Sequence, residues 1–188
     1  MKHPLVQAAV ELRESLHGLT FSAPITHTYQ PLDYAWQSHR DYLERYGSAK
    51  KRVLFLGMNP GPYGMTQTGV PFGEIAAVRD WMKIQHPVDL VLDAHPKRPI
   101  QGFSCPKSEV SGRRLWGLFA ECFPDALDFF REHFVANYCP LVWMTASGAN
   151  VTPDKISATE MRPVEEACIA HLTKVIHALK PEFLIGVG

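Results

Sequence analysis

The chain has 188 residues, and its 19 Lys and Arg residues balance its 19 Asp and Glu residues, so the formal net charge is zero. This balance argues against a strongly basic nucleic-acid-binding tail and against an acidic disordered chain. Since 46% of the residues are hydrophobic and 20% are charged, the chain is long and apolar enough to bury one sizeable core. We expect a single domain over residues 1–188.

The sequence carries no pattern typical of a membrane span or a signal peptide. No apolar run approaches the roughly 20 residues that a membrane-spanning helix needs, and Glu11, Arg13 and Glu14 interrupt the segment where a signal peptide would be apolar. The four cysteines are widely spaced, without a CxxC pair: Cys105, Cys122, Cys139 and Cys168. We therefore expect an intracellular protein, cytoplasmic if bacterial and nuclear if eukaryotic, with reduced thiols and no zinc site.

The first third of the chain has two helical patterns. Apolar residues recur at helical spacing over 4–17 and over 34–46, and each pattern is ended by a glycine, Gly18 or Gly47. The residues between them, 20–32, are punctuated by proline and are expected to be a connector. Both helices are predicted to be packing elements.

A buried strand and a long loop follow. Residues 53–57 (VLFLG) are wholly apolar and rich in β-forming types, which is typical of a strand buried on both faces in a parallel sheet. Residues 58–74 hold four Gly and three Pro, so regular structure is not expected there. A loop of this length inside a compact domain is usually functional.

The rest of the chain alternates helices and strands. The pattern predicts helices over 75–84, 112–122, 125–132 and 159–179, strands in the first half of 134–144 and over 182–188, a connector over 85–112 and a polar loop over 147–155. Three apolar strands separated by helices indicate an α/β fold with a mostly parallel sheet. Ligands of such sheets bind beyond the carboxyl ends of the strands, which directs attention to the loop after 53–57 and to the segment around 137–140.

The segment GMNPGPYG, residues 57–64, combines backbone freedom with rigidity. Glycines permit close approach to a ligand, and prolines fix the path between them: Gly57, Pro60, Gly61, Pro62 and Gly64. Asn59 is held in this frame, and its amide carbonyl can accept a hydrogen bond from a water molecule and orient it. An ordinary Asn-Pro turn accounts for the spacing equally well. The segment matches neither a P-loop nor a dinucleotide-binding fingerprint.

Two further side chains could bind a planar ring. Phe72, between Pro71 and Gly73, is either a plug in the core or a stacking platform. Asn137 lies in an otherwise apolar run, and a buried amide must satisfy its hydrogen bonds. Its neighbouring acceptor and NH2 donor complement the N3–H and O4 edge of uracil, whereas cytosine presents the opposite polarity.

Local charge departs from the neutral total. Between His95 and Arg114 a single acid, Glu109, stands among five basic residues: Lys97, Arg98, Lys107, Arg113 and Arg114. Such a stretch is commonly solvated surface, but beside a glycine-rich loop it can hold phosphates. In the polar loop, Ser147, Gly148 and Asn150 offer neutral donors suited to a DNA backbone.

Taken together, these motifs resemble the single-strand-selective monofunctional uracil-DNA glycosylases. The resemblance covers most of the chain from residue 30 onward and rests on five segments: VLFLGMNPGPYGMTQTGVPFGE (53–74), FSCPKSEVSGRRLWG (103–117), NYCPLVWM (137–144), SGANVTPDK (147–155) and LIGVG (184–188). It implies a three-layer α/β/α sandwich around a mainly parallel four-stranded sheet. It also implies a monomeric enzyme without metal or organic cofactor, which starts base-excision repair by removing uracil and 5-modified uracils from single- or double-stranded DNA.

The resemblance also assigns roles to residues. Asn59 would position the hydrolytic water, the backbone of Met58 and the ring of Phe72 would bind the base, and Asn137 would read its edge. Gly61 would leave room for a substituent on C5, where a tyrosine stands in the better-known uracil glycosylases. The DNA strand would be contacted by Ser147, Gly148, Asn150 and Lys155.

Two features separate the sequence from the family pattern. Family members continue to a fourth strand and an HPSPRN-type motif, whose histidine would stabilise the departing O2, whereas this sequence ends at Gly188; we therefore expect a C-terminally incomplete chain. Ala149 stands where the family loop often has arginine. An alternative function is a uracil-sensing DNA-binding protein or pseudoenzyme without cleavage. An iron–sulfur uracil glycosylase would require cysteine spacings that the sequence lacks.

Overall fold

The computed structural model describes residues 3–188 and contains a parallel sheet with the strand order β3-β2-β6. Its strands are β2 (Val53–Gly57), β3 (His133–Asn137) and β6 (Phe183–Val187). β2 pairs with both neighbours in parallel, with Val53 opposite His133 and opposite Phe183. The three apolar strands predicted from the sequence are thus confirmed, as is the α/β class.

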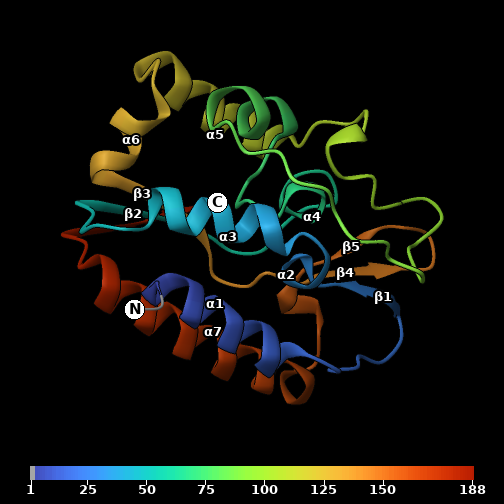
Figure 1. Cartoon of the computed structure of the whole chain (residues 1–188). Helices are drawn as coiled ribbons and strands as arrows, with labels where there is room; N and C mark the ends of the chain where they lie inside the picture. Colours follow the sequence, from blue (N-terminus) through green and yellow to red (C-terminus); the bar gives the residue numbers. More distant parts are fainter. Residues whose placement is uncertain (1–2) are drawn as a thin grey trace.

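Helices cover both faces of this sheet, as the expected three-layer arrangement requires. Figure 1 shows α1 and α7 side by side on one side of the sheet and α5 and α6 on the other. The helices are α1 (Pro4–Leu16), α2 (Pro31–Tyr34), α3 (Trp36–Tyr46), α4 (Met65–Thr68), α5 (Val110–Cys122), α6 (Ala126–Glu132) and α7 (Ala158–Leu179). Among the described residues, none of the helices has the length and apolar character needed to cross a membrane.

Local sequence sets the starts of two of these helices. Ser157 caps α7 by accepting a hydrogen bond from the backbone N–H of Glu160 at 3.3 Å, in the Ser-x-x-Glu pattern of a capping box. Asp125 caps α6 by accepting from the Leu127 N–H at 2.9 Å. Each cap satisfies a backbone donor that the first turn of a helix leaves unpaired.

An aromatic cluster joins β2 and β3 to their helices. The ring of Phe55 lies 5.1 Å from Phe119 of α5 and 6.5 Å from Phe129 of α6, measured between centroids. The hydroxyl of Tyr42 in α3 donates to the carbonyl of Val135 at 2.8 Å, so α3 occupies the edge of β3 that does not pair with β2. The position of β2 is therefore fixed by its contacts with α5 and α6, and that of β3 by its contact with α3.

A second, antiparallel sheet was not predicted. It consists of β1 (Ile25–Tyr29), β4 (Val142–Thr145) and the short β5 (Asn150–Val151), in the order β1-β4-β5. β1 lies within residues 20–32, which were expected to be a connector. Its five residues include polar types and follow a proline, so they do not show the apolar run of a buried strand. β4 was hidden in the apolar run that begins with β3. The polar loop predicted to contact DNA, residues 147–155, begins in the turn between β4 and β5 and continues through β5 to the 3-10 turn Pro153–Lys155.

One smaller expectation was also wrong: the segment 58–74 is not wholly irregular, because α4 forms a single helical turn within it. The helix expected over 75–84 is present but shorter, with helical residues from 75 to 81. Most of it is a π-helical turn, Ala77–Trp81, and the Met82 N–H donates to the Ala77 carbonyl at 2.9 Å. Two 3-10 turns complete the structure, Gly102–Ser104 and Pro153–Lys155.

Candidate active site

Two of the predicted site residues, Phe72 and Asn137, converge around Gly57 at the carboxyl ends of β2 and β3. Gly57 and Asn137 are the last residues of these strands and lie opposite each other in the ladder. A Cβ atom at Gly57 would lie 2.4 Å from Cζ of Phe72 and 2.6 Å from Oδ1 of Asn137. Only glycine therefore fits between the ring and the amide. The parallel sheet thus brings together a planar apolar surface and a hydrogen-bonding edge.

The backbone around Phe72 is held in an unusual conformation. Phe72 has a φ angle of 53°, in the left-handed region that non-glycine residues rarely adopt. The Trp116 indole N–H donates to the carbonyl of Pro71 at 3.1 Å, and Gly112 of α5 packs against the carbonyl of Phe72. Such a conformation persists only when its surroundings over-determine it. The position of the Phe72 ring is therefore set by α5.

Asn59 and Met58 leave β2 beside this group. The Asn59 amide Nδ2 donates to the carbonyl of Leu141 at 3.2 Å, which directs its nitrogen into the protein and leaves its oxygen available. The Met58 carbonyl accepts from the Cys139 N–H at 2.9 Å. The Met58 side chain is 55% exposed. The Asn59 amide thus has one fixed orientation, and its oxygen has no hydrogen-bond donor among residues 3–188.

The Asn137 side chain is buried and weakly paired. Its Nδ2 donates to the thioether sulfur of Met65 at 3.3 Å, a weak acceptor. A small cavity of about 30 Å³ adjoins Asn137 and is lined by Met65, His39 and His171 among others, but not by Asn59 or Phe72. This cavity is too small for a base. A ligand at the strand ends would offer Asn137 stronger partners than sulfur does.

Glu109, which sequence reasoning counted only as the lone acid of a basic stretch, touches the loop that carries Asn59. A Cβ at Gly61 would lie 2.7 Å from the Glu109 Oε2 atom, and a Cβ at Gly64 would lie 3.0 Å from its Cγ. The same Oε2 accepts a hydrogen bond from the Tyr63 N–H at 3.1 Å. The space that Gly61 leaves is thus bordered by a carboxylate from the start of α5. No local sequence signal indicates this contact.

Tyr63 and Arg98 join this loop to the β4–β5 turn. The Arg98 guanidinium lies 5.3 Å from the centre of the Tyr63 ring and donates to the tyrosine hydroxyl. Its Nε atom also donates to the carbonyl of Gly148 at 3.0 Å. Lys107 also contacts Tyr63, with 3.2 Å between its Nζ and the hydroxyl. Two cations from the basic stretch therefore gather at Tyr63.

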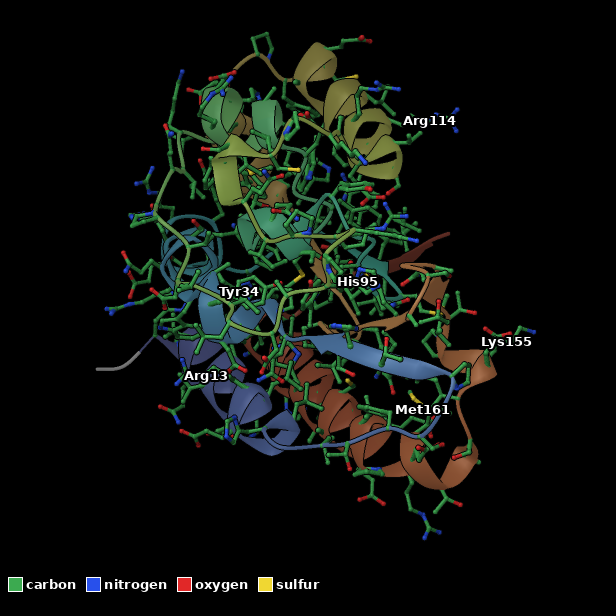
Figure 2. The ribbon with its side chains drawn as sticks, turned by 90° about the vertical axis from the view of Figure 1, so that its right-hand side faces the viewer. Arg13, Tyr34, His95, Arg114, Lys155 and Met161 are labelled. Atoms are coloured by element: carbon green, nitrogen blue, oxygen red, sulfur yellow. The ribbon has the colours of Figure 1, made fainter. Side chains whose placement is uncertain are left out.

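The remaining predicted DNA contacts are spread over the same face. Ser147 and Gly148 lie in the β4–β5 turn, where the Gly148 N–H donates to the Thr145 carbonyl at 2.9 Å. Asn150 is exposed at the start of β5. Figure 2 shows His95, three residues before Arg98 in the chain, near the middle of this face. Lys155 lies at the margin of the face and points outward.

The basic stretch is likewise divided. Figure 2 shows Arg114 projecting from α5 at another margin of the face, away from His95. Lys155, a predicted DNA contact outside this stretch, is paired with its neighbour Asp154 at 3.1 Å. The sequence cluster is therefore not one patch, because only Arg98 and Lys107 reach Tyr63.

Two histidines beside the cavity are held neutral by burial. Burial lowers the pKa of His39 to about 4, and the hydrogen bond to the Gly69 carbonyl offsets this only in part. Burial lowers the pKa of His171 to about 4 as well, and the nearby His39 and Lys174 act in the same direction. All four cysteines are free thiols. Within residues 3–188, His, Cys, Asp and Glu side chains form no group of three or more suited to a metal ion.

Comparison with known proteins identifies the family. The sequence model of the uracil DNA glycosylase superfamily matches residues 44–188. A single-strand selective monofunctional uracil DNA glycosylase of Bos taurus is 45% identical over 183 residues, which are 97% of this chain and 67% of the bovine protein. The Mus musculus protein of the same name is also 45% identical over 183 residues, covering 97% of this chain and 66% of the mouse protein. The chain thus spans about two thirds of the length of these curated relatives.

A solved structure supports the same fold. The crystal structure of wild-type SMUG2 of Pedobacter heparinus superimposes with a TM-score of 0.62 at 19% sequence identity, over 97% of this chain and 86% of that chain. The likeness in fold agrees with the sequence matches. The chain belongs to the uracil DNA glycosylase superfamily.

Proposed function

We propose that this chain hydrolyses the N-glycosidic bond of uracil, and of 5-modified uracils such as 5-hydroxymethyluracil, in single- or double-stranded DNA. The proposal rests above all on the convergence of the Phe72 ring and the Asn137 amide over Gly57, beside Asn59. Its relatives are named uracil DNA glycosylases, which supports the same reaction. The product is an abasic site that base-excision repair processes further.

Base recognition requires that uracil leave the helix stack. An enzyme acting on a base extrudes it into a pocket, at a cost of a few kcal/mol that is smallest for unpaired bases. Stacking on an aromatic ring contributes roughly 1–3 kcal/mol per base. In the proposed complex the ring of Phe72 supplies this surface, and the Asn137 amide pairs with N3–H and O4. The weak bond between Asn137 and the Met65 sulfur is exchanged for stronger ones.

The hydrolytic step uses Asn59 to orient water. Because Nδ2 of Asn59 is committed to the Leu141 carbonyl, its Oδ1 atom can accept a hydrogen bond from a water molecule. An amide is too weak a base to drive attack on an intact bond. We therefore infer a dissociative path, in which the glycosidic bond breaks first and water captures a sugar with oxocarbenium character.

The departing uracil carries negative charge on O2, and a preorganised donor stabilises such charge. The Met58 backbone directly follows β2, and we propose its N–H for this role. Tyr63 lies on the same loop as Met58, and the side chains of Arg98 and Lys107 contact its ring. In the proposed complex these two cations add positive potential near the DNA strand. In the proposed complex the chain's own groups thus stack on the base, hydrogen-bond to its edge, orient the water molecule and stabilise the negative charge of the leaving uracil.

Incubation of the purified protein with a labelled uracil-containing oligonucleotide, followed by alkali, tests the proposal. Base removal leaves an alkali-labile site, so strand breaks at the uracil position are expected, and a thymine-containing oligonucleotide of the same sequence should stay intact. Retention of the labelled strand in a complex without any breaks would instead favour the uracil-sensing binding protein.

A further inference from the structure

The single turn of α4 contacts the side chain that is proposed to read the base edge. Its first residue is Met65, whose sulfur accepts the hydrogen bond from the Asn137 Nδ2 at 3.3 Å. At its other end Gly69 closes the turn, since the Gly69 N–H donates to the Met65 carbonyl at 2.7 Å. A chain of hydrogen bonds thus runs from Gly69 through Met65 to the amide of Asn137.

The Asn137 amide has little else to hold it on this side. The cavity of about 30 Å³ that it adjoins is lined largely by apolar side chains, such as Phe134 and Val135. Apart from the sulfur of Met65, no group in the part of the chain that the structure describes hydrogen-bonds to this amide. The orientation of the amide therefore depends on where α4 places Met65.

A turn of four residues does not hold its own position, because an isolated helix needs about 12 residues to be even marginally stable. Contacts from α2, from α3 and from the residue between them hold α4 instead. The Tyr34 hydroxyl donates to the Thr66 carbonyl at 2.9 Å. The His39 Nδ1–H donates to the Gly69 carbonyl at 2.8 Å. A Cβ at Gly69 would lie 2.5 Å from the Ala35 carbonyl oxygen, so the end of α4 packs tightly against this segment.

The hydrogen bond to Gly69 defines the state of the His39 ring. A carbonyl oxygen only accepts hydrogen bonds, so the proton lies on Nδ1. His39 is 7% exposed, and burial lowers its pKa to about 4. Near pH 7 the ring is therefore neutral, and its Nε2 atom carries no proton. The donor that holds α4 is thus the Nδ1–H of one tautomer.

We propose that His39 is a positioning residue of the base-binding site: its Nδ1–H holds the Gly69 carbonyl, and the α4 turn fixed in this way orients the Asn137 amide. The inference rests on the proposed function, since it assumes that this amide pairs with uracil. His39 lies on α3, outside the group at the strand ends, and acts on the base through Asn137. Displacement of α4 would leave the amide present but misdirected.

Two amide substitutions at His39 separate this role from packing. The NH2 group of asparagine stands where Nδ1 of histidine stands and can donate to the Gly69 carbonyl, whereas the amide of glutamine extends to the Nε2 position. We expect His39→Asn to stay within about threefold of the wild-type maximal rate of uracil excision and His39→Gln to lose about tenfold or more, because misplaced binding groups slow the reaction strongly. His177→Gln, at an exposed histidine of α7, is the control and should keep the wild-type rate.

The maximal rate and the half-saturating protein concentration are measured under single-turnover conditions with a single-stranded uracil oligonucleotide. Affinity for a uracil-free oligonucleotide is measured in parallel and should not change in any variant, since α4 acts on the base-reading amide. Tyr34→Phe removes the hydrogen bond to the Thr66 carbonyl with little change in volume. It should also lower the maximal rate, by about threefold or more, and it provides the test if His39→Gln does not fold.

Equal rates in His39→Asn and His39→Gln would overturn the inference, as would a wild-type rate in Tyr34→Phe. A loss of affinity for uracil-free DNA in place of a loss of maximal rate would overturn it too. In each of these cases excision of uracil by the wild-type protein still upholds the proposed function. A wild-type protein that excises no uracil would overturn the proposed function and this inference together.

Discussion

Gly112 packs directly against the backbone of Phe72: a Cβ at position 112 would lie 2.0 Å from the Phe72 carbonyl oxygen. No heavy atoms approach this closely without a bond, so any side chain at 112 must displace either α5 or the Phe72 backbone. Because Phe72 already has a φ angle of 53°, its conformation depends on this contact. The aromatic ring of the proposed site is thus held by α5, a helix that begins at Val110, 38 residues after Phe72 in the chain.

Gly112→Ala should therefore lower both stability and activity. Overpacking of this kind costs about 1–3 kcal/mol, and displacement of the Phe72 ring should reduce uracil excision about tenfold or more. Gly117→Ala, on the same helix with no atom within 4 Å of its Cβ, is the control and should be neutral or slightly stabilising. Thermal unfolding and single-turnover excision measure the two effects. Equal behaviour of the two variants would show that Gly112 does not hold Phe72.

Asn137→Asp should change the edge that the site presents to the base, because a carboxylate accepts hydrogen bonds but cannot donate them. The NH2 donor of Asn137, which now contacts the Met65 sulfur at 3.3 Å, becomes an acceptor that repels O4 of uracil. We expect uracil excision to fall about tenfold or more and the ratio of cytosine to uracil excision to rise. Both rates are measured on otherwise identical single-stranded oligonucleotides. An unchanged ratio would place base reading elsewhere.

The strands at the site were predictable because their sequences report their environment directly. Runs such as 53–57 are apolar at every position, which is typical of strands in a parallel sheet, and parallel pairing then places Gly57 opposite Asn137. The burial expected for such a run is not found in β6, which is equally apolar but exposed. β1 was missed because its burial is partial and its residues are mixed in polarity. A short strand of that kind is stabilised by its neighbour rather than by its own pattern.

The contact between Glu109 and Gly61 could not be predicted for a different reason. The hydrogen bond from the Tyr63 N–H to Glu109 spans 46 residues of sequence, and it depends on where α5 packs. Nothing in the local sequence distinguishes such an acid from a solvated one. The same applies to Arg98, whose two partners, Tyr63 and Gly148, belong to separate loops. Glycine positions carried more information, since Gly57 and Gly112 both mark close approaches in the site.

Arg98→Ala should weaken catalysis on DNA more than the loss of another surface cation does. It removes the hydrogen bond to the Gly148 carbonyl and the contact with the Tyr63 ring, so two loops of the site lose their link. We expect excision to fall about tenfold and thermal stability to decrease, because a buried acceptor loses its partner. Arg114→Ala, at the exposed margin of the face, is the matched control. If excision and thermal stability fell equally in both variants, Arg98 would contribute only its positive charge and not a link between the two loops.

Acid should destabilise the fold through His39 and His171. Both have a folded-state pKa of about 4, below the value of about 6.5 in an unfolded chain, because burial disfavours their charged forms. The unfolded state therefore takes up protons first, so stability is fully present above about pH 6.5 and falls as the pH drops toward 4. The slope approaches about 1.4 kcal/mol per pH unit for each histidine.

Chemical denaturation at several pH values between 6.5 and 5 measures this slope. His171→Gln removes one titrating group and should roughly halve the slope in that interval. A free energy of unfolding that stays constant from pH 6.5 to 5 would contradict the burial of both imidazoles in neutral form.

The most direct test compares wild type, Asn59→Ala and Asn59→Asp in single-turnover excision of uracil from a single-stranded oligonucleotide, with DNA affinity measured in parallel. Removal of the water-positioning oxygen should lower the rate by about a hundredfold or more in Asn59→Ala without a matching loss of affinity. Asn59→Asp should remain active, since a dissociative path tolerates a better base, although its bond to the Leu141 carbonyl is lost. Full activity in Asn59→Ala, or abolished activity in Asn59→Asp with intact folding and binding, would contradict the proposed role of Asn59.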